Sequence, residues 1–361
     1  MNILHITDEL TKKNYSISSL IFYLTEYIEN KNQIRHNILS TYLERDTFND
    51  KNNIILIKTN SFLNCYKNVS NIKDIIKNHE YVHIHGIWRW IHFISIFHCA
   101  RLSIPFFIHP HGMLLNAALK NKGFFNYFMK KILLKLYSFF LKKRINFISI
   151  TKQESESINF FFKNTSIHLI PNPVPFLINQ DPIKIEKVFI FFGRLHPIKN
   201  LELMIEAFTE ANLGDDWKLD IYGIKDDKKY HKKLILMIEG RKNIFIKKPV
   251  FGLEKQKIIS SSWANILLSK SEVLSLSVLE SASLELPSLV NEDIAIDEFT
   301  KNEGVVTTTE IKSISKNIKE ISNWSLKLRI KKGKKLKEFI NLNYSIESLY
   351  KKYYYLYDNK R

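Results

Sequence analysis

Short runs of isoleucine, valine and phenylalanine alternate with helical patterns along most of the chain, and this alternation restricts the fold more than any other feature. Five runs lie in the first half, at residues 3–6, 54–57, 81–85, 105–108 and 145–150. Five more lie at residues 188–192, 218–222, 244–247, 266–269 and 288–291. Strands that alternate with helices form parallel sheets with helices on their faces. The sequence therefore predicts an α/β protein with two such domains.

A proline-rich segment separates the two sets of runs. Ile170-Pro171-Asn172-Pro173-Val174-Pro175 contains three prolines in five residues. Proline cannot continue a helix and favours an extended conformation in the residue before it, so an extended connector is expected here. We place the domain boundary at this connector, with the first domain at residues 1–172 and the second beginning at residue 173.

The composition is that of a folded protein with a basic surface. Of 361 residues, 45% are hydrophobic, which is enough to build two cores of ordinary domain size. Lysine and arginine number 54 against 36 acidic residues, so the surface attracts phosphates, anionic lipids or nucleic acid. Cys65 and Cys99 are too few for a disulfide framework, and Asp8 and Glu9 interrupt any signal-peptide core. These features predict a cytoplasmic protein that does not span a membrane.

Two stretches are unusually basic. Residues 120–144 interleave lysines with aromatic and aliphatic side chains, a pattern that suits an amphipathic helix lying on an anionic bilayer surface. A half-buried helix with solvated lysines fits the same pattern. Residues 327–337 are expected to form a solvated helix face, and they lack the aromatic interleaving and motifs of nucleic-acid-binding proteins. We expect no nucleic-acid partner.

The first candidate site is the segment Gly193-Arg194-Leu195-His196-Pro197-Ile198-Lys199-Asn200, which follows the run at 188–192. A helix is expected from near Lys199, and ligands of parallel sheets bind where strands end and helices begin. Gly193 lets the backbone approach a ligand, Arg194 offers paired planar donors, and Lys199 adds a compact charge. The segment predicts a diphosphate site. The alternative is a surface loop with two solvated cations.

Two carboxylates form the second candidate site. Glu272 and Glu280 follow the run at 266–269, and Glu280 is expected in the first turn of a helix. Carboxylates so placed can accept hydrogen bonds from sugar hydroxyls, one on a transferred sugar and one on a ribose. A structural role for Glu280 is also open, because Ser277-Val278-Leu279-Glu280 matches a capping box.

Taken together, these motifs resemble the retaining glycosyltransferase family 4, which belongs to the glycosyl transferases group 1. The resemblance lies in Gly-Arg-Leu-x-x-x-Lys-Asn, then Glu-x7-Glu-Ser-Ala, then Leu-Pro-Ser-Leu-Val, and it extends to the connector at 170–174. It implies the GT-B fold, two Rossmann-like α/β domains with a donor and acceptor cleft between them. It also implies a nucleotide-sugar domain at residues 173–342, and a helix at residues 343–361 that packs back on the acceptor-side domain 1–172.

The resemblance assigns roles to individual residues. Arg194 and Lys199 match the pair that neutralises the leaving diphosphate, Glu272 matches the contact to the donor sugar, and Glu280 matches the contact to the ribose. His111 matches a histidine that faces the donor sugar. The full implied set is catalytic His111, Arg194, Lys199 and Glu272; donor-binding Gly193, Arg194, Lys199, Glu272, Leu274, Ser275, Leu276 and Glu280; and acceptor-side His85, Trp88, Asn14 and Ser16.

The implied activity is transfer of a sugar from a nucleotide-sugar to a growing surface polysaccharide or lipid-linked saccharide, with retention of configuration. Fixed cations and a helix N-terminus stabilise the leaving group, so no metal and no cofactor is expected. We expect a cytoplasmic enzyme whose basic stretch 120–144 makes a peripheral contact with the inner face of the cell membrane. A catalytically inactive nucleotide-sugar-binding partner subunit is the alternative, because residues 11–16 lack the usual glycines and Val273, Ser275 and Glu285 stand where glycine is common.

Overall fold

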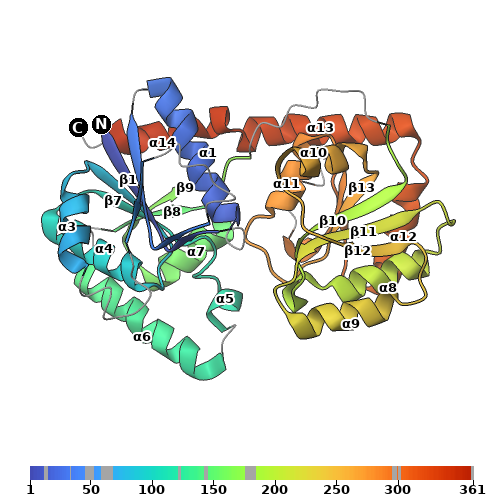
Figure 1. The fold of residues 1–361 in the computed structure, drawn as a ribbon, viewed down its shortest axis with the longest axis horizontal. Coiled ribbons are helices and arrows are strands. Elements are labelled where there is room, and N and C mark those ends of the chain that lie inside the picture. The colour runs from blue at the N-terminus through green and yellow to red at the C-terminus, as the bar shows by residue number, and fades with distance from the viewer. Residues whose placement is uncertain are drawn as a thin grey trace. The chain divides into compact units, whose positions relative to one another are not determined.

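The computed structural model describes residues 1–11, 15–32, 34–44, 53–57, 68–120, 123–141, 145–174, 184–294, 299 and 302–358. The chain divides into two compact units (Figure 1). The N-terminal unit comprises Met1–Pro173 and Leu349–Arg361, and the C-terminal unit comprises Val174–Ser348. Each unit is built around its own parallel sheet, so the predicted α/β class with two domains is confirmed.

The N-terminal unit contains a seven-stranded sheet in the order β5-β3-β1-β6-β7-β8-β9, in which all pairs are parallel. Its strands are β1 (Asn2–Thr7), β3 (Arg35–Ser40), β5 (Asn53–Leu56), β6 (Tyr81–His85), β7 (Phe106–His109), β8 (Asn146–Ser149) and β9 (Ser166–Leu169). A two-stranded sheet pairs β2 (Glu9–Leu10) with β4 (Tyr42–Leu43). The helices are α1 (Tyr15–Asn32), α3 (Val69–Lys77), α4 (Trp90–Leu102), α5 (Asn116–Lys120), α6 (Gly123–Leu141), α7 (Lys152–Phe161) and α14 (Ile346–Asp358).

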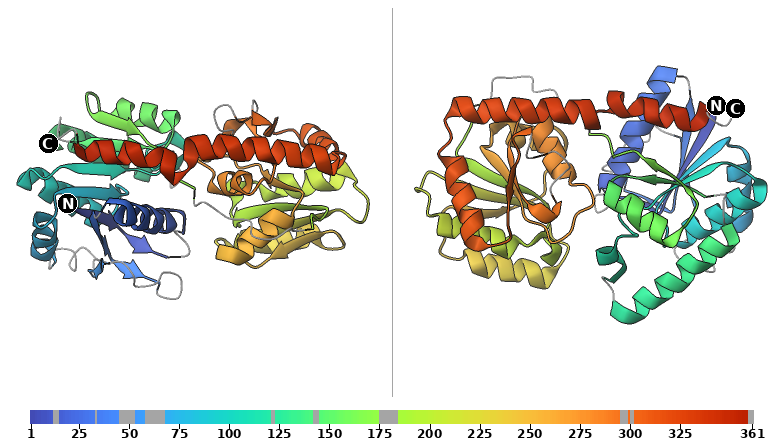
Figure 2. Two further views of the ribbon diagram at one scale, coloured as in Figure 1. Left: turned by 90° about the horizontal axis from the view of Figure 1, so that it is seen from above. Right: turned by 180° about the vertical axis from the view of Figure 1, so that it is seen from behind.

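The two faces of this sheet have different chemistry. Alternate strand residues such as Leu4, Val82 and Ile108 enter a hydrophobic core shared with α3, α4 and α6. The intervening residues, among them His5 and His83, point to the opposite face. That face is covered by α1 and α14, which lie across the sheet from α3, α4 and α6 in Figures 1 and 2. The histidines of the strands are therefore buried between the sheet and these two helices.

The C-terminal unit contains a six-stranded parallel sheet in the order β12-β11-β10-β13-β14-β15. Its strands are β10 (Val188–Arg194), β11 (Lys218–Ile224), β12 (Ile244–Lys247), β13 (Ala264–Leu267), β14 (Ser288–Asn291) and β15 (Val305–Thr307). The helices are η2 (Pro197–Lys199), α8 (Leu201–Ala211), α9 (Lys228–Ile238), α10 (Gly252–Ser261), α11 (Leu276–Ser283), η3 (Glu292–Ile294), α12 (Ile311–Ser322) and α13 (Leu326–Tyr344).

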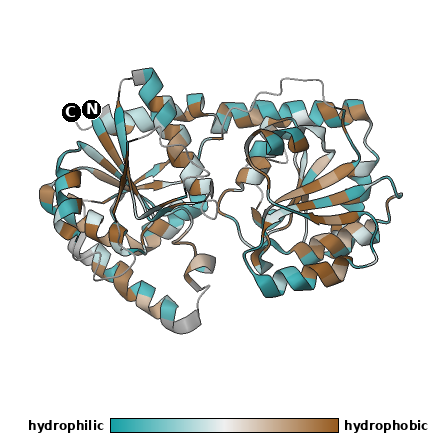
Figure 3. Cartoon of the chain, in the orientation of Figure 1, coloured by the Kyte–Doolittle hydropathy of each residue, from teal (hydrophilic) through white to brown (hydrophobic). Residues whose placement is uncertain are grey.

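Strand β10 is buried on both faces, as expected for the centre of a parallel sheet. Phe189 and Phe191 enter the core that contains α8 and α12, whereas Ile190 packs against Ile259 of α10. Figure 3 shows the hydrophobic residues concentrated in the strands and in the helix faces that cover them. A nearly continuous apolar run in the sequence is the direct consequence of this two-sided burial.

The structure corrects several details. Strands β3, β9 and β15 were not predicted from the sequence, because polar residues break β3 and β9 and β15 has only three residues. Strand β13 begins two residues earlier than the predicted run at 266–269. The solvated face expected at residues 327–337 is wrong in part. Arg329 of α13 is buried, and its guanidinium donates hydrogen bonds to the carbonyl oxygens of Ser262 and Trp263 at 2.7 and 3.2 Å.

Candidate functional site

The C-terminal sheet has its topological switch point between β10 and β13. The chain moves from β10 outward to β11 and β12, and then returns to the other side of β10 to form β13. Ligands of open parallel sheets bind outside the carboxyl ends of the strands at such a point. The loop after β10 carries Arg194 and Lys199, and the loop after β13 carries Glu272. The topology thus brings both predicted motifs to one edge of one sheet.

Direct bonds hold these two loops together. The backbone amide of Lys270 donates to the carbonyl oxygen of Ile198 at 2.8 Å. The Lys199 ammonium pairs with Oε1 of Glu272, and the Ser269 hydroxyl donates to the same oxygen at 3.0 Å. The side chains of Lys199 and Glu272 are only 15% and 17% exposed, so this pair is shielded from solvent and is not a loose surface contact. The alternative of two solvated cations therefore does not hold for Lys199.

Arg194 lies at the end of β10 and is more exposed. Its Nη1 donates to Oδ2 of Asp226 at 3.0 Å. Asp226 belongs to the loop that follows β11, the strand next to β10. Gly193 precedes Arg194 where the chain is crowded, because a Cβ atom there would lie 2.7 Å from the ring of Phe191. The residue before Arg194 must therefore be small.

Glu280 lies in a different position from the one that the sequence predicts. Helix α11 begins at Leu276 with Ser275 as its N-cap, so Glu280 occupies the second turn and the capping-box interpretation is wrong. Its carboxylate pairs with the ammonium of Lys255 on α10, and both side chains are less than one-fifth exposed. Lys255 also lies over the ring of Phe192, 5.2 Å from its centroid. A cation thus lies beside the carboxylate that the resemblance assigns to the ribose.

The N-terminus of α11 is formed by the other predicted donor-binding residues. Leu274 and Leu276 pack against the core of the unit, which fixes the backbone between them. Within the described part of the chain, the side chain of Ser275 makes no capping hydrogen bond to the helix, and its hydroxyl lies 3.2 Å from that of Ser277. The amide groups and the positive end of an eight-residue helix therefore lie near Glu272, where they favour an anion.

In the N-terminal unit, the loop after β7 carries His111. The backbone at His111 is left-handed, with φ of 49°, and Gly112 follows with φ of 80°. The buried carboxylate of Glu154 accepts hydrogen bonds from the amides of Gly112 and Ile150, at 2.5 and 2.8 Å. Burial raises the pKa of Glu154, whereas these two amide bonds oppose the rise. Glu154 fastens the strained loop to the end of β8.

His111 is also one end of a row of four histidines joined by hydrogen bonds, here named the imidazole row. In the row, Nδ1 of His36 lies 3.0 Å from Nε2 of His5, and Nδ1 of His5 lies 3.0 Å from Nε2 of His85. Nδ1 of His85 lies 3.1 Å from Nε2 of His111. A shorter series joins the Tyr357 hydroxyl of α14 to His83 and then His109, at 2.9 and 2.8 Å.

Burial lowers the pKa of every histidine in these two series. The pKa falls to about 4 for His36 and His111 and to about 3 for His83, chiefly because burial penalises the charged ring. The pKa values of His5, His85 and His109 are also well below the ordinary value, through burial and the mutual repulsion of neighbouring rings. All six rings are therefore neutral at neutral pH.

Three of these histidines could in principle hold a metal ion. His85, His109 and His111 each offer a nitrogen, and the three nitrogens lie within 4.8 Å of one another. The rings, however, are stacked, with interplanar angles of 13° to 25° and centroids 4.4 to 5.7 Å apart. A metal lies in the plane of each imidazole that binds it, so lone pairs must converge on one point. Nitrogens of these rings are already engaged, because Nδ1 of His85 bonds to Nε2 of His111 and Nε2 of His109 bonds to Nδ1 of His83, and coordination would break these bonds.

The predicted acceptor-side residues that the structure describes, His85, Trp88 and Ser16, differ in burial and in contacts. Both ring nitrogens of His85 bond to other histidines, so His85 offers no free nitrogen to a ligand. Trp88 is partly buried, with the Lys130 ammonium 5.2 Å from its ring centroid. Ser16 is exposed in the first turn of α1, and Asn14 lies outside the described residues.

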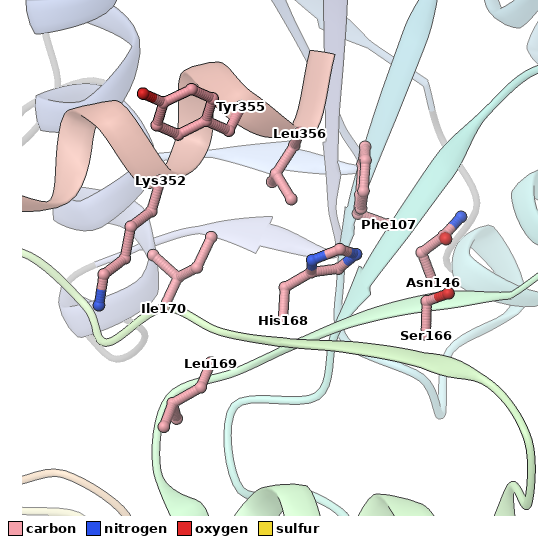
Figure 4. Close-up of a pocket in the computed structure, with 9 residues that line it drawn as sticks. All are labelled: Phe107, Asn146, Ser166, His168, Leu169, Ile170, Lys352, Tyr355 and Leu356. Carbon is pink, nitrogen blue, oxygen red and sulfur yellow. The ribbon is translucent and has the colours of Figure 1, made fainter. Parts of the chain in front are cut away.

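The N-terminal unit also has a pocket of about 370 Å³ on the face of β7, β8 and β9 that α14 partly covers. Figure 4 shows Lys352, Tyr355 and Leu356 of α14 on one side and His168 on the other. Its lining residues are Phe107, Asn146, Ser166, His168, Leu169, Ile170, Lys352, Tyr355 and Leu356. None of them is a predicted site residue.

Sequence reasoning missed several residues that complete these arrangements. Asp226 and Lys255 pair with predicted site residues but are distant from them in sequence. Glu154 gives no local signal. The histidines do have a local sequence signal. His83-Ile84-His85 repeats a histidine at the two-residue period of a strand, which places both side chains on one face.

Comparisons with known proteins bear on the family and on the fold. Residues 176–339 match the family model described as glycosyl transferases group 1. No curated protein matches the chain in sequence. The matched residues all lie in the C-terminal unit.

The whole chain is similar to solved structures at low identity. HepE of Anabaena in complex with UDP is 11% identical, with a TM-score of 0.80 over 99% of this chain and 100% of that one. A glycosyltransferase of Rickettsia africae is 14% identical, with a TM-score of 0.78 over 99% and 98%. Sucrose-phosphate synthase of Thermosynechococcus elongatus is 13% identical, with a TM-score of 0.74 over the same shares.

These findings confirm the resemblance to group 1 glycosyltransferases and the GT-B fold. They support the coarser prediction of a glycosyltransferase. Among the described helices, none is both long enough and apolar enough to cross a bilayer.

Proposed function

We propose that this chain is a retaining, metal-independent glycosyltransferase that transfers a sugar from a nucleotide-sugar to a growing surface polysaccharide or lipid-linked saccharide. The observation that carries the proposal is the shielded Lys199–Glu272 pair at the switch point of a group 1 domain, beside Arg194 and the N-terminus of α11. Cations and helix amides bind a diphosphate, and the carboxylate accepts hydrogen bonds from a sugar hydroxyl. The HepE structures contain UDP or UDP-glucose, which supports a donor of this class.

The proposed reaction breaks the bond between the anomeric carbon and the diphosphate oxygen, and the diphosphate keeps the electron pair. The acceptor oxygen forms the new bond from the same face, and its proton passes to the departing phosphate. Arg194 and Lys199 stabilise the charge on the leaving group, so the residues themselves supply what a metal ion would otherwise provide. His111 keeps the role of a contact to the transferred sugar.

The experiment is a panel of UDP-, GDP- and ADP-sugars tested by thermal shift and by turnover in EDTA. A donor at about 100 times its Kd adds about 2.7 kcal/mol to the stability of the folded protein, which a thermal shift detects. We expect one donor class to bind and to be turned over in EDTA, with the anomeric configuration retained in the product, as read by NMR. Absence of turnover from every donor, with no change in Arg194→Ala, would refute the proposal.

The same panel separates the second candidate function, a binding subunit without activity. The left-handed backbone at Glu285, with φ of 61°, occurs at a position where glycine is common in this family, and it favours this candidate only weakly because Lys337 pairs with Glu285 and stabilises it. Tight donor binding without turnover in the presence of any acceptor extract would favour the binding subunit.

We also propose a peripheral contact between the N-terminal unit and the cytoplasmic face of an anionic membrane. Helix α6 buries Leu134 and Tyr137, yet it has a second, exposed apolar stripe on its opposite side. Helix α4 has exposed aromatic residues of its own, and its Phe93 packs edge-on against Tyr137 on the buried side of α6. The exposed residues are Trp90, Phe93, Phe97, Phe128, Met129, Ile132 and Leu136, each at least 38% exposed.

Lysines flank this surface. Lys135 is exposed and Lys131 is partly exposed, which suits the headgroups of anionic lipids, whereas Lys130 donates to the carbonyl oxygen of Ala118. An apolar stripe that is not needed for the core and is bordered by lysines is typical of an interfacial helix. Of the two interpretations of residues 120–144, these exposures support the membrane surface.

We expect the protein to sediment with phosphatidylglycerol vesicles and only weakly with phosphatidylcholine vesicles. Phe128→Asp with Leu136→Asp should weaken binding at least tenfold, because burial of two such side chains contributes roughly 3 kcal/mol or more. Leu253→Asp in the C-terminal unit, also highly exposed, is the matched control and should leave binding unchanged. Equal binding of both variants would exclude this surface as the contact.

A further inference from the structure

The hydrogen bonds of the imidazole row all run in the same sense along the four rings. Every link joins Nδ1 of one ring to Nε2 of the next, from His36 through His5 and His85 to His111. A neutral imidazole has one N–H donor and one bare acceptor nitrogen. Each link needs one donor and one acceptor. The nitrogen that carries hydrogen in one ring therefore determines which nitrogen carries hydrogen in the other three.

The row therefore has two neutral arrangements. In the first, all four rings carry hydrogen on Nδ1, so Nδ1 of His111 is a donor and Nε2 of His36 is bare. In the second, all four carry hydrogen on Nε2, so Nδ1 of His111 is an acceptor and Nε2 of His36 carries hydrogen. These two end nitrogens are buried and have no hydrogen-bond partner among the described residues, so neither end fixes the arrangement.

We propose that the imidazole row is a tautomer relay that sets the hydrogen-bonding polarity of His111, with His85, His5 and His36 as positioning residues. The proposal deepens the proposed function, on which the role of His111 rests. With hydrogen on every Nε2, His111 has an acceptor at its buried Nδ1, and with hydrogen on every Nδ1 it has a donor there. The latter arrangement leaves Nε2 of His36 bare, three rings away.

The surroundings of the row keep its rings neutral and in place. His5 stacks on His83 with ring centroids 4.9 Å apart. The two residues are register partners in β1 and β6. The amide of His36 donates to Oε1 of Glu29 on α1 at 2.8 Å, which ties the far end of the row to that helix. Burial lowers the pKa values of all four rings, and this agrees with a row that has no charged member at neutral pH.

Nitrogen-15 NMR of the whole protein tests the relay without any substrate, because the two ring nitrogens differ in shift according to which one carries hydrogen. We expect His36, His5, His85 and His111 to be neutral and to show the same tautomer, or the same ratio of tautomers. One ring with hydrogen on Nδ1 beside another with hydrogen on Nε2 would overturn the proposal. So would a zinc-induced shift of His85, His109 and His111 together, which would show a metal site instead.

A variant supplies a kinetic test. A leucine at position 5 has no nitrogen that could donate or accept, so His5→Leu should uncouple the tautomer of His36 from that of His111. We expect kcat to fall on the order of tenfold with KM within twofold. His79→Leu is the matched control, because His79 is buried and bonds to Asn37 at 2.7 Å outside the row.

The two measurements separate the possible failures. If no donor is turned over but the four tautomers agree, the relay stands and the proposed function fails. If turnover is normal but the tautomers disagree, or if His5→Leu and His79→Leu behave alike in both NMR and kcat, the relay fails. Should His5→Leu not fold, the tautomers of the unmodified protein still decide the question.

Discussion

Lowering the pH from 7.5 to 5.5 is expected to unfold the N-terminal unit while the C-terminal unit stays folded. Burial lowers the pKa to about 4 for His36 and His111 and to about 3 for His83 and His92. In the unfolded chain each ring has a pKa near 6.5, so below that pH the unfolded state binds protons that the folded state does not.

The direction of the effect follows from this difference. The stabilisation that comes from keeping these histidines neutral in the folded state is fully present above pH 6.5. It is lost as the pH falls toward the pKa values of the rings in the folded protein. Each of the four rings then removes roughly 1 kcal/mol between pH 7.5 and 5.5. His5, His85 and His109 act in the same direction. The total is several kcal/mol, comparable with the roughly 5–15 kcal/mol that holds a typical domain folded.

Hydrogen exchange read by mass spectrometry, corrected for the intrinsic effect of pH, can follow each unit in the intact protein. The C-terminal unit is the internal control, because its sequence contains two histidines, His196 and His231, and both are partly exposed. Protection should be lost in β1, β6 and β7 and retained in β10 and β13. Equal loss in the two units, or full protection of both at pH 5.5, would show that buried histidines do not control the acid stability.

Lys199→Ala is expected to lower donor turnover by a factor of roughly 10²–10³, provided that the chain is the proposed transferase. The substitution removes a cation from the leaving diphosphate and leaves the carboxylate of Glu272 without its ion-pair partner. A shielded carboxylate left in this way also repels the phosphate. The loss should appear mainly in kcat, because the charge on the diphosphate grows in the transition state.

A second lysine of the same unit, Lys187, is the control for this prediction. Lys187 also forms an ion pair in the same unit, with Asp216 at 2.5 Å, but both side chains are more than half exposed. Lys187→Ala should leave turnover unchanged, since exposed pairs contribute little. Addition of Glu272→Gln to Lys199→Ala should not restore kcat, because the cation is still missing. A Lys199→Ala variant with unaltered kcat and KM would remove the diphosphate role from this loop.

The starts of four strands in the second sheet, β10, β11, β12 and β14, could be read from the sequence. Strand β14 is buried along its whole length, as expected for a strand inside a parallel sheet, and the run at 288–291 coincides with it. Strand β12 lies at the edge of the sheet and is buried only at Ile244, but its run Ile244-Phe245-Ile246 is apolar enough to be recognised. Strand β9, Ser166-Ile167-His168-Leu169, lies at the edge of its sheet and is only half-buried, so its pattern is weaker.

Part of the candidate site was predictable because its residues follow strands that the sequence reveals. Arg194, Lys199 and Glu272 each follow a recognisable strand, and parallel strands bring such residues to one edge. Their partners Asp226 and Lys255 could not be predicted, since a pair between distant elements leaves no local pattern. The start of α11 was misjudged because Ser277 and Glu280 have the spacing of a capping box, yet the helix begins at Leu276.

Helix α14 gives the chain an unusual order of assembly. Its residues from Leu349 onward belong to the N-terminal unit, and there the Tyr357 hydroxyl bonds to His83 while Tyr81 donates to the carbonyl oxygen of Tyr357. During synthesis the ribosome releases the first 173 residues, and then the whole C-terminal unit, before this helix emerges. The N-terminal unit is therefore translated first, but its histidine-bearing sheet face is completed last. The C-terminal unit can fold before α14 packs on that face.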